Sequence, residues 1–158
     1  MPRCLMALLF IFLTGGTAVM AQAAETSQGI AVSDPVHYVR VVTDPEGQTH
    51  FADAVLTFEL VDFAPPAPPI SVSALFDADN VSFISSPAGW YGDWHPAPRR
   101  QFVVVLAGEL EVAVSDGEVR RFGPGSFCLL EDTTGKGHAS RVVSTTRALA
   151  AAIPLAQD

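Results

Sequence analysis

Cysteine and basic residues are both scarce in this chain of 158 residues. The two cysteines are Cys4 and Cys128, and Cys4 lies in an apolar leader, so we expect no disulfide in the chain that follows the leader. Nine Lys and Arg stand against 17 Asp and Glu, which gives a formal net charge of −8. Without a basic run to follow a phosphate backbone, nucleic-acid binding is not expected.

Two common sequence motifs of enzymes are missing as well. Gly135-Lys136-Gly137 lacks the Ser or Thr and the helix that complete a phosphate-binding loop, so we expect no nucleotide cofactor. No serine stands on a recognisable strand-to-helix turn, which argues against a serine hydrolase.

The first 24 residues have the pattern of a Sec-type signal peptide. A basic Arg3 precedes an apolar stretch over residues 5–20, and Ala21-Gln22-Ala23 is a small-x-small cleavage site. Residues 14–17 interrupt the apolar stretch, which is short for a membrane span of about 20 residues. We expect cleavage near Ala23 or Ala24, a periplasmic or secreted protein, and no membrane attachment after cleavage.

The remaining chain has the length of one domain. Residues 25–35 are small and polar and are interpreted as a flexible linker, and residues 36–158 as a single β-barrel domain. Short segments rich in β-branched and aromatic residues alternate with Gly, Pro, Asn and Asp turns, which predicts an all-β sandwich or barrel. These segments are 36–42, 54–61, 71–76, 80–84, 101–106, 109–114, 118–122, 126–130, 139–143 and 147–153.

Local patterns refine this prediction. Residues 109–114 alternate between polar and apolar, as in a half-buried strand, whereas residues 102–106 are apolar throughout, as in a strand covered on both faces. The proline-rich residues 64–69 are expected to connect strands, because proline cannot donate to a strand ladder. Cys128 has apolar neighbours, so we expect a buried, unreactive thiol.

Residues 89–108 carry the candidate functional site. They place His95 and Gln101 in a turn that leads into the apolar strand, and a second cluster, residues 122–131, leads towards His138. Two turn-and-strand units that each present a histidine predict a polar site in the mouth of a small barrel.

The spacing of these residues resembles the two sequence motifs of the cupins. Gly89, His95, Ala97, Gln101 and Gly108 stand at the spacing of the first motif, and the second motif runs from Gly125 to His138 with about two extra residues before the histidine. The resemblance implies a double-stranded β-helix, a jelly-roll barrel, and a homodimer is common among its members.

The resemblance also implies a metal site, but the ligand set is altered. Cupins that bind metal use three His and one Glu for a divalent ion such as Fe, Mn, Ni, Zn or Cu. Here His95 and His138 keep two of these positions, Ala97 replaces a histidine, and Gln101 replaces the glutamate with a neutral carbonyl oxygen. Two interpretations stay open: His95, Gln101 and His138 hold a metal, or the two histidines are hydrogen-bonding groups in a metal-free pocket.

Other polar and aromatic residues near the motifs are candidates for substrate binding. One of Arg99 and Arg100 would face the pocket and clamp a carboxylate, or both pair with surface acids. Trp94 lies in an aromatic cluster that would line the mouth or a dimer interface, and Glu131 opens the unusual loop before His138. We therefore expect either a metal-dependent enzyme of a small polar metabolite, or a module that binds or senses a small molecule without turning it over.

Overall fold

The protein is described by a computed structural model of residues 31–156. The predicted signal peptide and residues 25–30 of the predicted linker lie outside these residues. Residues 31–35 belong to no strand and are exposed, although the backbone N–H of Ser33 donates to Ser71 Oγ at 2.8 Å. The described part of the chain contains no helix, and so none that is long and apolar enough to cross a membrane.

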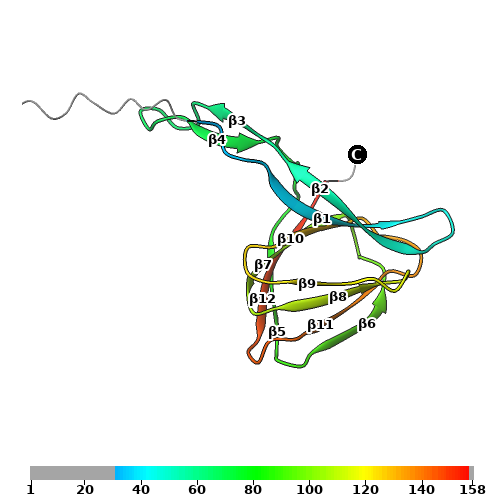
Figure 1. The fold of residues 1–158 in the computed structure, drawn as a ribbon. Helices are drawn as coiled ribbons and strands as arrows, with labels where there is room; N and C mark the ends of the chain where they lie inside the picture. The colour runs from blue at the N-terminus through cyan, green and yellow to red at the C-terminus, as the bar shows by residue number, and fades with distance from the viewer. Residues whose placement is uncertain (1–30, 157–158) are drawn as a thin grey trace, which may run out of the picture. The chain divides into compact units, whose positions relative to one another are not determined.

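The described residues form twelve β-strands, which confirms the prediction of an all-β fold (Figure 1). The N-terminal strands are β1 (Val36–Thr43), β2 (Thr49–Leu56), β3 (Phe58–Val61), β4 (Ile70–Ser73), β5 (Ser82–Ser86) and β6 (Tyr91–His95). They are followed by β7 (Gln101–Ala107), β8 (Leu110–Val114), β9 (Val119–Phe122), β10 (Phe127–Leu130), β11 (His138–Val142) and β12 (Ala148–Pro154).

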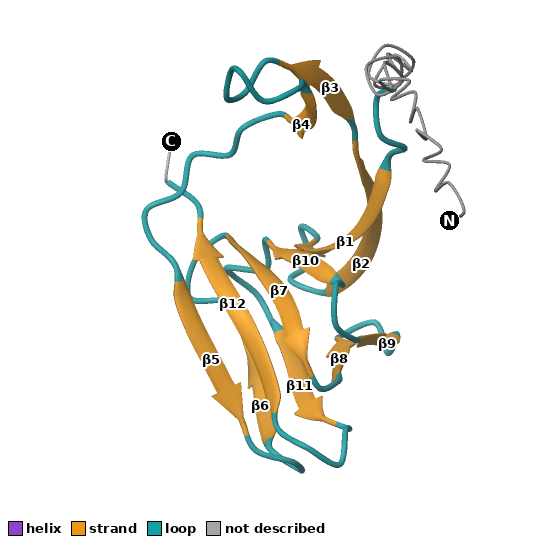
Figure 2. Ribbon diagram, turned by 90° about the vertical axis from the view of Figure 1, so that its left-hand side faces the viewer, coloured by secondary structure: helices purple, strands orange, loops and turns teal. Residues whose placement is uncertain are grey.

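Ten of these strands build the two sheets that carry the candidate site, as Figure 2 shows. The six-stranded sheet has the order β2-β1-β10-β7-β12-β5, and all its neighbours are antiparallel except β1 and β10. The four-stranded sheet has the order β6-β11-β8-β9. Each sheet therefore joins strands that are distant in the sequence, as the predicted jelly roll requires.

The remaining strands, β3 and β4, form a separate antiparallel pair. β3 follows directly on from β2 after Thr57 (Figure 1), so the structure divides the single strand predicted for residues 54–61. The proline-rich residues 64–69 lie in the connection between β3 and β4, in agreement with their interpretation as a connector of strands.

Successive side chains of a strand point to opposite sides of the sheet, and in the six-stranded sheet buried side chains lie on both sides. Val105, Cys128 and Leu130 belong to one buried cluster together with Val112, Val114 and Phe122 of the other sheet. Phe102 and Leu129 belong to a second cluster, and the ring of the exposed Phe76 meets that of Phe102 edge-on with a centroid distance of 4.9 Å. The prediction that the apolar strand over residues 102–106 is covered on both faces thus holds for Phe102 and Val105, whereas Leu106 is exposed.

The structure corrects the interpretation of residues 89–101 as a turn. Tyr91–His95 forms β6, an edge strand of the four-stranded sheet, and His95 is its last residue. Gly92 and Asp93 are poor strand formers, so local preference gives no sign of this strand. The pairing of Gly92 and Tyr91 with Ser140 and Arg141 of β11 imposes it.

Candidate functional site

Two histidines face each other where β6 and β11 pair. His138 lies opposite His95 in the register of the two strands, and the centroids of their rings are 4.8 Å apart. His138 is buried, with 6% of its surface exposed, whereas His95 is exposed at the mouth. The two histidines that the sequence motifs singled out are therefore neighbours in the fold.

The close approach of β11 to β6 depends on Gly137. This residue has a φ of +73°, and a Cβ atom placed on it would overlap with the backbone carbonyl of His95. Only glycine meets both requirements at no steric cost. The carbonyl oxygen of Gly137 also accepts a hydrogen bond of 2.7 Å from the hydroxyl of Thr49, which is fully buried.

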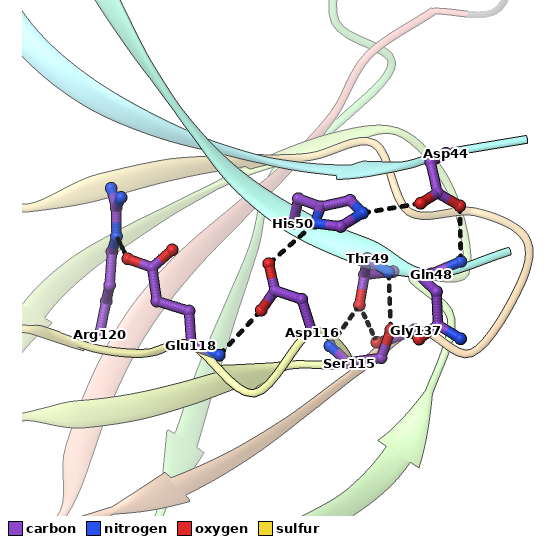
Figure 3. A network of polar contacts seen from close by, with 9 residues as sticks. All are labelled: Asp44, Gln48, Thr49, His50, Ser115, Asp116, Glu118, Arg120 and Gly137. Carbon is purple, nitrogen blue, oxygen red and sulfur yellow. Dashed lines mark hydrogen bonds and ion pairs between the residues drawn. The ribbon is translucent and has the colours of Figure 1, made fainter. Parts of the chain in front are cut away.

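Thr49 connects the site to two hairpins, as Figure 3 shows. Its hydroxyl also accepts from the backbone N–H of Ser115 at 2.8 Å, and its own N–H donates to Ser115 Oγ at 2.7 Å. These bonds tie the start of β2 and the turn between β8 and β9 to the backbone that precedes His138. The position of His138 is thus fixed from three elements.

The hydrogen bonds of the two rings show which nitrogen of each ring carries the proton. His95 Nδ1 lies 2.6 Å from the backbone oxygen of Asp93, and a carbonyl only accepts, so Nδ1 carries the proton. His138 Nδ1 lies 2.6 Å from Asp132 Oδ2 and donates in the same way to that carboxylate. Within residues 31–156 neither Nε2 has a hydrogen-bond partner. In the neutral rings both Nε2 atoms therefore present lone pairs.

Asp132 is the partner that sequence reasoning missed. It is fully buried, its backbone oxygen accepts from the N–H of Ala97 at 3.0 Å, and its Oδ1 has no hydrogen-bond partner among the described residues. A carboxylate on the far nitrogen of an imidazole orients the ring and makes it a better ligand. Its place in a polar loop six residues before His138 gave no pattern that would have singled it out.

The third predicted ligand, Gln101, comes from the other sheet. It is the first residue of β7, and together with His95 and His138 it lines a cavity of about 170 Å³ between the sheets. Ala97, at the position of the missing histidine, is buried in the core cluster and is 3% exposed. Among the described residues no three His, Cys, Asp or Glu side chains form a cluster that would hold a metal ion.

The donor set still fits a weakly held divalent metal. The two imidazole rings are oriented by their Nδ1 hydrogen bonds, and Gln101, whose side chain carries an amide oxygen, lines the same cavity. Imidazole suits Fe, Ni, Cu and Zn, and neutral oxygen ligands are tolerated beside it. The absence of a carboxylate in the first layer of ligands predicts a lower affinity than that of a complete set.

The residues predicted to bind substrate lie in different places. The two carboxylate oxygens of Glu131, whose side chain is 16% exposed, accept from Arg40 Nε at 2.5 Å and from Arg100 Nε at 2.9 Å. Arg99 lies 3.7 Å from Asp79 in a surface ion pair. Pairing with a surface acid was the alternative to binding a carboxylate substrate. None of these side chains belongs to the cavity lining.

The tryptophans separate onto two faces. Trp90 lines the cavity and its ring covers Gly92, where a Cβ atom would leave no room for the indole. Trp94 lies in a second, shallow hollow with Tyr91 and Arg141, and Lys136 Nζ lies 5.4 Å from its ring. Trp90 is thus the aromatic residue of the cavity mouth, while Trp94 faces away from it.

Cys128 is buried, as the sequence predicts. Its surroundings raise the pKa of the thiol to about 12, chiefly through burial and also through the charge of Asp132. At neutral pH the group is a thiol that packs against apolar neighbours. It lies in the wall of the cavity and not at its mouth with the two histidines.

The fold and site define a two-sheet β-barrel with a histidine pair at the mouth. No protein-family model matches the chain, and no curated protein matches it. Solved structures with a similar fold include a conserved protein of unknown function from Streptococcus pyogenes, with 21% identity over 49% of this chain and 65% of that chain and a TM-score of 0.39.

Two further neighbours are described as cupins. One is a Cupin 2 conserved barrel domain protein from Salinispora arenicola, with 20% identity, coverage of 62% of this chain and 73% of that chain, and a TM-score of 0.40. The other is an RmlC-like cupin protein from Desulfovibrio desulfuricans, with 15% identity, coverage of 85% and 98%, and a TM-score of 0.36.

Proposed function

We propose that the protein is a metal-dependent cupin enzyme that acts on a small molecule at the barrel mouth. The observation that carries the proposal is the pair of imidazoles that line one cavity, each with its Nδ1 in a hydrogen bond and its Nε2 without a partner among the described residues. His95, His138 and Gln101 would be the ligands, and the bound metal would supply a Lewis acid or a redox centre.

The chain itself prepares the site around these ligands. Asp132 holds the ring of His138, the backbone of Asp93 holds that of His95, and Gly137 allows the two strands to meet. The cavity behind the histidines is mostly apolar and limits the access of water to a molecule bound there. Binding and orientation of a substrate follow from these features, and they do not select a reaction type.

A second candidate function is a metal-free module that binds or senses a small molecule. The buried methyl of Ala97 and the neutral Gln101 favour it, because a histidine and a charge are both missing from the ligand set. In this case the two Nε2 atoms accept hydrogen bonds from the ligand.

Metal content distinguishes the two functions. We expect close to one equivalent of a divalent transition metal per chain in protein purified without chelator or affinity-tag histidines, and its loss in His95→Ala and in His138→Ala. His37→Ala is the matched control, since His37 lies in β1 outside the cavity lining. A protein that neither contains nor takes up metal would contradict the enzyme proposal and favour the binding module.

Two further properties belong to the proposal. Residues 1–24 support export to the periplasm or beyond the cell. A homodimer is supported by exposed apolar side chains on the edge strand β5 and on the β3–β4 pair: Val61, Phe63, Ile70 and Phe83 are each more than 40% exposed.

A further inference from the structure

The cavity behind the histidine pair differs in chemistry from its mouth. The hydrogen-bonding side chains of the histidines, Gln101, Ser86 and Ser140 are few, and most of the wall is apolar, made of aliphatic residues together with Trp90, Phe122 and Cys128. The aliphatic part comes from both sheets and includes Val103, Val105, Val112, Leu130 and Ala150. No Lys, Arg, Asp or Glu side chain lines the cavity within residues 31–156.

This wall discriminates against a ligand that is polar on all sides. A hydroxyl that enters an apolar cavity loses its hydrogen bonds to water, and the loss costs about 1–3 kcal/mol when no partner replaces them. A sugar or a polyol would carry more hydroxyls into the cavity than its few polar side chains could receive. A hydrocarbon group gains free energy in the same place because apolar surface leaves water.

The size of the cavity limits the hydrocarbon group. Its volume is about 170 Å³. An apolar cavity of about 150 Å³ is known to hold one benzene molecule, so the space corresponds to a single ring or a short branched chain of about six to ten carbon atoms.

We propose that the ligand of this site is a small amphiphile with one hydroxyl-type head and an uncharged ring or branched chain of that size. This inference rests on the proposed function and names its substrate class. The hydroxyl-type head lies at His95, His138 and Gln101. There it donates a hydrogen bond to an Nε2 atom, or it reaches a bound metal. The apolar part lies against Val103, Val112 and Ala150.

Three probes of nearly equal ring size test the proposal by isothermal titration calorimetry. Phenol has the head and the apolar ring, benzene has only the ring, and myo-inositol has a ring that is polar all round. We expect phenol to bind at least fivefold more tightly than benzene, and no binding of myo-inositol at the same concentrations. Equal or tighter binding of myo-inositol would overturn the proposal.

A matched pair of variants locates the binding. Ala150 and Ala151 are adjacent buried residues of β12, and of these two only Ala150 lines the cavity. Ala150→Val narrows the cavity and should weaken phenol binding at least tenfold, whereas Ala151→Val should change it less than twofold. Thermal unfolding of both variants identifies general damage. If both variants bind phenol like the parent protein, the assignment of the cavity is wrong.

If Ala150→Val fails to fold, a variant with an enlarged cavity tests the proposal instead. Val103→Ala removes two methyl groups from the wall, and we expect 4-propylphenol to gain at least fivefold relative to phenol. An unchanged preference would contradict the proposal. Failure of the metal proposal gives a different result, since phenol binding would persist while the metal content is zero in the parent protein.

Discussion

At the scale of single residues, glycine and aspartate determine the site as much as the histidines do. Gly137 brings His138 against His95, and Asp132 accepts a hydrogen bond from Nδ1 of His138 and so determines its tautomer. Neither residue is recognisable from its type or its neighbours in the sequence. The histidines were predictable because their spacing from glycines resembles a family motif, and Asp132 was not because its contact spans a loop.

Replacement of Gly137 should show how tightly the strands approach. Gly137→Ala adds a Cβ that overlaps with the backbone of His95 and also forces alanine to adopt a positive φ. We expect a loss of more than about 2 kcal/mol in the free energy of unfolding, beyond the roughly 1 kcal/mol of the φ effect alone. Chemical denaturation measures this loss.

Gly117→Ala is the control for the backbone effect. Gly117 has a φ of +98°, and a Cβ at this position has no neighbour within 4 Å. Its replacement should cost only the φ effect, about 1 kcal/mol. Equal losses in the two variants would show that the contact with His95 has no energetic weight.

At the scale of elements, the hairpins β1–β2 and β8–β9 are joined by a half-buried histidine, His50 (Figure 3). His50 Nε2 lies 2.8 Å from Asp44 Oδ2, and Nδ1 lies 2.8 Å from Asp116 Oδ2. The hydrogen bonds to Asp44 and then to Asp116 raise the pKa of His50 above its usual value of 6.5. The hydrogen bond to His50 in turn lowers the pKa of Asp44 below 3.8. The sequence predicts that His50 lies on a surface strand, but it does not predict that Asp44 and Asp116 are its partners.

The stabilisation from His50 should depend on pH in a defined direction. A raised pKa in the folded state means that the contribution is complete below about pH 6.5 and is lost as the pH rises through the folded value. Asp44 and Asp116 limit this stabilisation at acid pH. Because their pKa values are lowered in the folded state, the stabilisation is lost as the pH falls below about 3.8. We expect His50→Gln to lower Tm most between about pH 4 and 6.5 and less at pH 8 and above.

His37→Gln provides the comparison for this pH series. His37 lies in β1, the neighbour of the strand β2 that carries His50; it is exposed, and within the described chain it makes no side-chain hydrogen bond. Its replacement should leave the difference from the parent protein small at every pH. A Tm difference for His50→Gln that grows from pH 6 to pH 9 would contradict the assigned direction.

At the scale of the whole molecule, the β architecture was predictable and its outer connections were not. Turn residues and β-branched segments located most strands to within one or two residues, because these patterns are local. β6 and the division of residues 54–61 escaped prediction, since pairing with β11 and the separate β3–β4 sheet decide them. The position of Arg100 was not predictable for the same reason, because its ion pair with Glu131 joins residues that are distant in the sequence.

The edge of the six-stranded sheet provides the test of the proposed homodimer. Phe83 of β5 is 69% exposed on a strand that has a neighbour on only one side. We expect the parent protein to elute as a dimer and Phe83→Lys to shift the mass towards a monomer in size-exclusion chromatography with light scattering. Val119→Lys, on the exposed β9 of the other sheet, is the control and should keep the parental mass. A monomeric parent protein would contradict the homodimer.

The two tryptophans of the chain lie in contrasting surroundings, and this gives the molecule its own optical signal. Trp90, which is 39% exposed, borders the cavity and rests on Gly92, while Trp94, similarly exposed at 41%, lies outside the cavity lining beside Lys136. With Trp94 replaced by phenylalanine, the remaining indole emission comes from the cavity mouth alone. Occupation of the cavity is then readable as a change in the colour or intensity of fluorescence, without any label on the protein.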